Sequence, residues 1–138
     1  MLLWHFIRVH LSPEELGHAM RSSGLHSSSI EAASETLLLD LLYTQLQIPG
    51  DKQVTLEKII SDLETSKQPH LIVFDNFETP WNGNQTQVGN ILRRLDMLDH
   101  IAILVTMRGK HAPCHNSIKW QSIDIKSTDE AASLRIYI

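Results

Sequence analysis

The sequence is poor in cysteine, in basic residues and in long apolar runs, and each shortage narrows the class of protein. Its single cysteine, Cys114, excludes an internal disulfide framework and is typical of a reducing compartment. Lys and Arg number 12 against 16 Asp and Glu, and the formal net charge of −4 argues against a nucleic-acid groove. No apolar run approaches the roughly 18 residues that span a bilayer. We therefore expect a cytoplasmic chain without a membrane or nucleic-acid partner.

The N-terminal segment, residues 1–26, has no clear place in a fold. Its opening, MLLWHFIRVH, is apolar but short, and it lacks the small-residue cleavage site of a signal peptide. Residues 12–20, SPEELGHAM, predict a short helix with Ser12 as its N-cap, and a serine-rich loop follows. Whether residues 2–9 form a strand of the sheet stays open. We therefore place the domain itself at residues 27–138.

Helices and strands alternate along residues 27–138, which predicts an α/β fold with a parallel sheet. Apolar residues at helical spacing predict helices over 30–46, 54–65 and 85–98, and a capping signal at Ser127 or Thr128 predicts another over 127–138. Continuous apolar runs predict strands over 71–75 and 101–106, and a short strand is expected within 118–125. Residues 76–84 between the first strand and the next helix are expected to form a loop. Because the two apolar runs do not alternate with polar residues, we expect both faces of these strands to be buried.

Polar side chains follow both apolar strands. Asp75 ends the run HLIVFD, whereas Thr106 and Arg108 end the run ILVTMR. Ligands of an open parallel sheet bind beyond the carboxyl ends of its strands, where a carboxylate can hold Mg²⁺ and a guanidinium can reach a terminal phosphate. The pattern therefore favours Asp75 as a Mg²⁺ ligand and Thr106 and Arg108 as nucleotide contacts. A plainer interpretation stays open, in which the three are a turn former, a strand end and a solvated charge.

The strings PHLIVFDNFETPWNGN, ILRRLDML and IAILVTMRG resemble the NB-ARC-type nucleotide-binding domain of STAND signalling NTPases, in the form found in fungal NLR-like proteins. The resemblance implies a P-loop NTPase-like fold of three layers that binds ADP or ATP with Mg²⁺. It makes Asp75 the Walker B aspartate that acts on Mg²⁺. It places Asn76 and Glu78 at the neighbouring catalytic positions, and it makes Arg108, with Thr106 near it, the sensor 1 position.

Two departures from the family pattern bear on activity. Many relatives carry a second acid directly after the first, but Asn76 has an amide that cannot accept a proton, which implies slow hydrolysis or none. No phosphate-binding string G-x-x-x-x-G-K-[ST] is present, and the only Gly-Lys pair, Gly109-Lys110, is followed by His111. The resemblance covers residues 37–134 and thus implies a partial NB-ARC domain, with the Walker B and sensor 1 half but without the P-loop strand-helix unit. We expect such a chain not to bind or hydrolyse ATP tightly alone.

Other functions stay open. A half-domain with an unfinished sheet could be a non-enzymatic interaction module, a decoy or regulator that docks on a full-length NLR-like relative or associates with itself. The chain could also be a gene fragment without a function of its own. The string HAPCH, residues 111–115, offers His and Cys side chains but too few ligands for a structural zinc site. Nothing in the sequence supplies Cys114 with the orienting acid that a catalytic cysteine needs.

Overall fold

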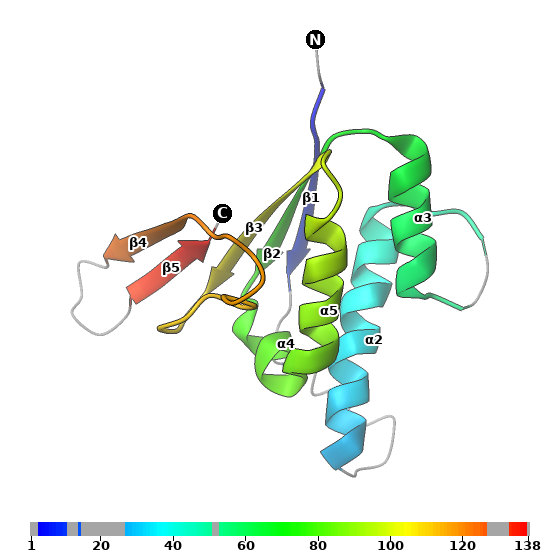
Figure 1. Cartoon of the computed structure of the whole chain (residues 1–138). Helices are drawn as coiled ribbons and strands as arrows, with labels where there is room; N and C mark the ends of the chain where they lie inside the picture. The colour runs from blue at the N-terminus through cyan, green and yellow to red at the C-terminus, as the bar shows by residue number, and fades with distance from the viewer. Residues whose placement is uncertain (1–2, 11–13, 15–26, 51–52, 127–132, 138) are drawn as a thin grey trace.

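The computed structural model of the chain describes residues 3–10, 14, 27–50, 53–126 and 133–137. Within these ranges, helices pack against a single mixed sheet (Figure 1). The elements are β1 (His5–His10), α2 (Ser27–Gln45), α3 (Leu56–Ser66), β2 (His70–Asp75), α4 (Glu78–Gly83), α5 (Gln85–Asp96), β3 (Ile101–Met107), β4 (Ser122–Lys126) and β5 (Ser133–Tyr137).

The sheet has the strand order β1-β2-β3-β5-β4. Strands β1, β2 and β3 are parallel and in register, so that His70 lies opposite His5 on one side and opposite Ile101 on the other. Strand β5 pairs antiparallel with β3, and β4 pairs antiparallel with β5. The chain therefore has an α/β fold with a three-stranded parallel sheet flanked by helices, as the alternation of elements predicted.

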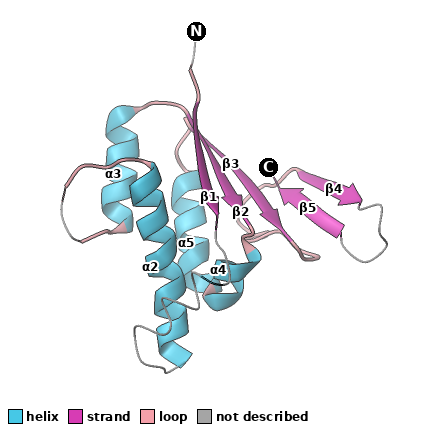
Figure 2. Ribbon diagram, turned by 180° about the vertical axis from the view of Figure 1, so that it is seen from behind, coloured by secondary structure: helices cyan, strands magenta, loops and turns pink. Residues whose placement is uncertain are grey.

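The helices lie on one face of the parallel strands in both views of the described residues (Figures 1 and 2). The strand order explains this arrangement. Crossovers between parallel strands are right-handed, so strands that are added in the direction β1, β2, β3 place every connecting helix on the same face. A helix layer on the second face requires a reversal of strand order, and the three parallel strands contain none.

The side chains of the parallel strands are buried on the helix-covered face and more exposed on the opposite face. Ile72 and Phe74 on the helix-covered face are fully buried, whereas Leu71 and Val73 on the opposite face are half-buried and Phe6 is 65% exposed. The prediction that both faces of the strands are buried is therefore wrong for the described residues. We call the second face the open face. It carries the alternate residues of the three strands, which are Phe6, Arg8, His10, Leu71, Val73, Asp75, Ala102, Leu104 and Thr106.

The helices form where the apolar spacing predicts them. Helix α3 begins after Thr55, whose side chain accepts the Lys58 N–H, and ends at Lys67 in the left-handed conformation. Its residues Ile59 and Leu63 are fully buried against the other helices and the sheet. Helix α5 begins after Asn84, whose side chain accepts the Gln87 N–H. These bounds, and those of α2, confirm the predicted helices over 30–46, 54–65 and 85–98.

Local sequence signals gave two wrong predictions. Residues 76–84, expected to be a loop, contain the short helix α4, because Pro80 fits a first helical turn and Phe77 anchors the segment in the core. Residues 133–137, expected to be helical, form strand β5, because the free edge of β3 offers backbone hydrogen bonds that outweigh the capping signal. The expected strand within 118–125 is confirmed by β4. Residues 127–132, and the expected helix at 12–20 except Glu14, lie outside the described residues.

The N-terminal segment does contribute a strand. Residues His5–His10 form β1, which among the described strands pairs with β2 alone and therefore lies at an edge of the described sheet. A P-loop strand is central in its sheet, so β1 does not occupy that position. The other side of β3, the remaining position next to the parallel strands, is taken by the antiparallel strand β5.

Candidate functional site

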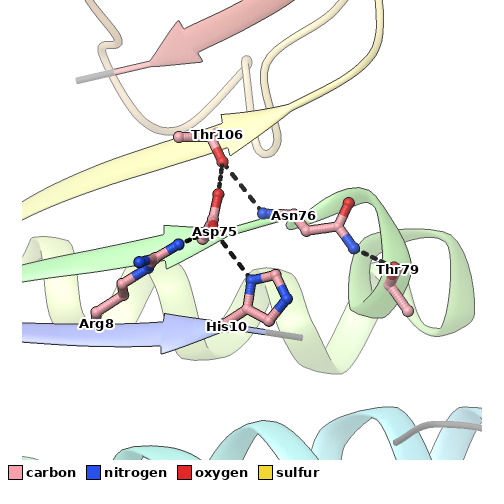
Figure 3. Close-up of polar contacts among 6 residues, drawn as sticks. All are labelled: Arg8, His10, Asp75, Asn76, Thr79 and Thr106. Atoms are coloured by element: carbon pink, nitrogen blue, oxygen red, sulfur yellow. Dashed lines mark hydrogen bonds and ion pairs between the residues drawn. The ribbon is translucent and has the colours of Figure 1, made fainter. Parts of the chain in front are cut away.

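Asp75 is the centre of a polar cluster at the carboxyl end of the open face (Figure 3). Its Oδ1 accepts a hydrogen bond from Thr106 Oγ1 at 2.6 Å. Its Oδ2 accepts a hydrogen bond from Arg8 Nη2 at 2.7 Å, and His10 Nδ1 lies 3.0 Å from the same oxygen. Both carboxylate oxygens are therefore engaged by side chains from the two neighbouring strands.

The register of the parallel strands brings these side chains together. His10 lies directly opposite Asp75, and Arg8 lies two residues earlier on the same face of β1. On the other side, Phe74 lies opposite Val105, which places the next residues, Asp75 and Thr106, side by side. Successive side chains of a strand alternate between faces, so the four polar groups share the open face.

The hydrogen bond from Thr106 and the ion pair with Arg8 lower the pKa of Asp75 from 3.8 to about 2, against the opposing effect of partial burial. His10 adds a smaller contribution in the same direction. The carboxylate is therefore ionised at neutral pH, and its negative charge is balanced by a guanidinium. The cluster is a formed ion pair rather than a free carboxylate.

We expect Asp75→Asn to lower the free energy of unfolding by about 1–2 kcal/mol at pH 7, after allowance for solvent screening of a part-exposed pair. Because the folded-state pKa is depressed, this stabilisation is complete above the ordinary pKa near 4 and is lost as the pH falls through about 2. Urea unfolding of both proteins between pH 7 and pH 2 measures it. The exposed Asp99→Asn is the control, and a difference that persists unchanged at pH 2 would contradict the prediction.

The backbone conformation at position 76 favours asparagine. Its φ of 61° lies in the left-handed region, which asparagine adopts more readily than most residues. Its backbone N–H donates to Thr106 Oγ1 at 3.1 Å, and its amide Nδ2 donates to Thr79 Oγ1 at 3.3 Å. Asn76 thus forms the tight turn between β2 and α4, which accounts for an amide at this position without reference to catalysis.

Glu78 and Arg108 are joined by a hydrogen bond from the backbone of Arg108 to the side chain of Glu78. The Arg108 N–H donates to Glu78 Oε2 at 3.4 Å, so both residues lie near the carboxyl ends of β2 and β3. Within the described residues, the Arg108 guanidinium forms no hydrogen bond or ion pair. The structure therefore brings Asp75 and Thr106, both expected at the carboxyl ends of strands, into contact, and the arginine that binds the carboxylate is Arg8.

Arg8 and His10 were not predicted to be members of the site. Their two-residue spacing in the string FIRVH is the signal that could have found them, because it puts both on one face of a strand. The contact with Asp75 also requires β1 to pair with β2 in one particular register, and no local pattern specifies that pairing.

The cluster does not fit a magnesium ion in this arrangement. Mg²⁺ needs carboxylate oxygens that are free to coordinate it, and both oxygens of Asp75 are occupied by hydrogen-bond donors. Within the described ranges, no three His, Cys, Asp or Glu side chains gather closely enough to hold a metal ion. The expected Mg²⁺ role of Asp75 therefore depends on displacement of Arg8 and His10.

The residues of the HAPCH string form a packed loop. Cys114 is buried next to α5, where its Sγ lies 3.6 Å from the Gly89 carbonyl oxygen, and burial raises its pKa. The rings of His111 and His115 lie 5.9 Å apart at the surface. Cys114 therefore faces the core, and the plainer interpretation of this string as a loop is supported.

Comparisons of the chain with protein-family models, with curated proteins and with solved structures found no match. The resemblance to NB-ARC domains therefore stays a prediction that depends on the residue pattern. Within the described residues, none of the helices has the length and apolar character needed to cross a bilayer.

Proposed function

We propose that this chain is a partial nucleotide-binding domain of the NB-ARC type from an NLR-like STAND signalling protein. It has the Walker B and sensor 1 half of a P-loop NTPase-like three-layer fold and lacks the P-loop strand-helix unit. Asp75 is the Walker B aspartate, Thr106 and Arg108 form the sensor 1 position, and Asn76 and Glu78 complete the site. The parent domain uses Mg²⁺ with ADP or ATP.

The hydrogen bond between Thr106 and Asp75 is the observation that carries the proposal. It joins the ends of two adjacent parallel strands, each apolar and each followed by the polar residues of the pattern. Carboxyl ends of neighbouring parallel strands are where α/β proteins bind nucleotides. If Asp75 only formed a turn, its carboxylate would not need a hydrogen bond from the Thr106 hydroxyl on β3.

The same geometry supports weak nucleotide binding by the isolated chain. Arg8 and His10 occupy Oδ2 of Asp75, one of the two carboxylate oxygens that could coordinate Mg²⁺. The strands β1, β2 and β3 follow one another without a reversal, so they form no topological switch point, where α/β ligands bind. No P-loop sequence supplies the backbone amides that cradle phosphates.

We expect calorimetric titration of the wild-type chain with Mg²⁺–ADP and Mg²⁺–ATP to show no saturable binding in the low micromolar range. The double variant Arg8→Ala/His10→Ala removes both side chains from Asp75 Oδ2. We use Mn²⁺ as a probe for Mg²⁺ and expect the double variant to bind it at least about tenfold more tightly than the wild type. A gain of this size corresponds to one freed carboxylate–cation contact. Adding Asp75→Asn to the double variant is the control and should abolish the gain. Low-micromolar nucleotide binding by the wild type, or a gain that survives Asp75→Asn, would refute this account.

A second candidate function is a non-enzymatic interaction module that docks on a full-length NLR-like relative as a decoy or regulator. The open face supports it, because parallel sheets are ordinarily covered on both faces and this one exposes Phe6 and leaves Leu71 and Val73 half-buried. Co-purification of the chain with such a relative tests this candidate. Rapid proteolysis of the isolated chain, with no partner retained, would favour a gene fragment instead.

A further inference from the structure

Strand β1 presents a backbone edge that is ready to pair. The His5 N–H donates to the Pro69 carbonyl oxygen at 2.9 Å, so the backbone groups of His5 and of the alternate residues after it point toward β2. Those of Phe6, Arg8 and His10 consequently point away from the sheet. Within the described part of the chain, β1 pairs with no strand on that side.

Exposed apolar side chains gather at the same edge. Leu3 is 68% exposed, Trp4 is 52% exposed and Phe6 is 65% exposed. Ile7 and Val9, which follow on the same strand, are buried on the helix-covered face. Edge strands are ordinarily protected by lysine, proline or a bulge, and the run HFIRVH contains neither of these residues and pairs with β2 without interruption. An unprotected, apolar and regular edge strand is suited to pairing with another strand.

We propose that this chain forms a symmetric dimer in which β1 pairs antiparallel with β1 of a second copy, so that the two sheets become one continuous sheet. The proposal names the surface and the partner of the interaction-module candidate and rests on that candidate, but it requires neither nucleotide nor an accessible Asp75. The reason for a second copy, rather than another strand, is that β1 is complementary to itself.

Symmetry restricts the register. A two-fold axis between antiparallel edge strands stands perpendicular to the sheet, so residues that lie opposite each other must share a face. An axis at Ile7 places Phe6 opposite Arg8 of the second copy, and Trp4 opposite its His10. An axis at Arg8 would oppose two arginines, and an axis at Phe6 would place Phe6 opposite itself rather than opposite Arg8.

The Ile7 register also agrees with the side-chain chemistry. Each Arg8 guanidinium is already held on the open face by Asp75 at 2.7 Å, the face on which Phe6 of the other copy would lie. A guanidinium against an aromatic ring in a directly opposed pair is attractive, and the two-fold axis creates this pair twice. The alternate residues with outward backbone groups would form hydrogen-bonded pairs with one another. The pair of Phe6 with Arg8 therefore favours this register, and the backbone hydrogen bonding is compatible with it.

Sedimentation velocity of the full chain over a range of concentrations tests the dimer, with circular dichroism to verify that each variant is folded. Phe6→Lys would place a lysine opposite Arg8 of the second copy, and we expect it to raise the dimer Kd at least about tenfold. Phe6→Glu removes the same apolar ring but places a carboxylate opposite that arginine, and we expect the dimer to persist. Met97→Lys, at an exposed apolar residue on another element, should leave the Kd unchanged.

The register has its own test. Two directly opposed residues at the axis are close enough for a disulfide, so Ile7→Cys should form a cross-linked dimer on mild oxidation, whereas Cys114 of the wild type, which does not lie on β1, should not. A folded wild type that is monomeric at every concentration, or a Phe6→Lys variant that dimerises like the wild type, would overturn the proposal. Equal loss of the dimer in the lysine and glutamate variants would overturn the register. Titration with Mg²⁺–ADP separates this result from the nucleotide proposal, because the dimer should form equally with and without it.

Discussion

Replacing Phe77 with alanine is expected to lower the free energy of unfolding by about 3–5 kcal/mol, a large effect for a residue next to the candidate site. Phe77 is fully buried. Its ring centroid lies 5.4 Å from that of Phe74 and 6.3 Å from that of Trp81, against which it stacks. Truncation removes both aromatic contacts and leaves a cavity between β2, α4 and the core.

Urea unfolding at pH 7 measures this change. Met97→Ala is the matched control, because Met97 is 76% exposed and its truncation should change stability by no more than about 0.5 kcal/mol. Alanine keeps the backbone N–H that Phe77 donates to the Thr106 carbonyl oxygen at 2.9 Å, so the measured loss should report the aromatic side chain. A loss below about 1 kcal/mol would show that Phe77 is not a core residue.

Gly83→Ala is expected to destabilise the fold by about 1–3 kcal/mol, through overpacking rather than through loss of contacts. A Cβ at position 83 would overlap the Oγ of Ser34 and lie 3.1 Å from its Cβ. Ser34 is fully buried in α2, and α4 packs directly against that helix, so neither backbone can withdraw without moving a helix. The glycine therefore permits the close approach of α4 to α2.

A double-mutant cycle with Ser34→Ala tests this cause. Removing the Ser34 hydroxyl relieves the worst overlap, so the double variant should be more stable than the sum of the two single changes predicts, by about 1 kcal/mol or more. Gly89→Ala, whose Cβ would meet Cys114 Sγ at 3.0 Å, is a milder control at a second close approach. Additive effects of Ser34→Ala and Gly83→Ala would contradict the overlap as the cause.

Much of the fold could be predicted from the chain because its signals are local. Apolar spacing over three and four residues located α2, α3 and α5, and uniform apolar runs located β2 and β3. The location of Asp75 and Thr106 at one edge of the sheet followed from one general rule, that parallel strands end at the same edge, whereas their direct hydrogen bond was not predicted. The positions of β1 and β5 did not follow, because pairing between distant segments has no local signature.

In the candidate site too, some residues could be placed from local sequence signals and others could not. Asp75 and Thr106 each end an apolar run, so their placement could be inferred from the run itself. Arg8 could not be inferred as the partner of Asp75, because the two are 67 residues apart and meet only when β1 pairs beside β2. Arg108, inferred from its position after β3, has its backbone at the site but not its guanidinium on the carboxylate.

The sequence by itself determined the identity of helices α2, α3 and α5 and of strands β2 and β3, and it determined that polar residues would follow those strands. It could do so because hydrophobic periodicity and turn chemistry act between residues that are close along the chain. The tertiary structure alone decided which group would neutralise Asp75, that the sheet would keep an open face, and that residues 133–137 would be a strand. Those outcomes depend on strand order and register, which arise only when distant segments compete for the same backbone hydrogen bonds.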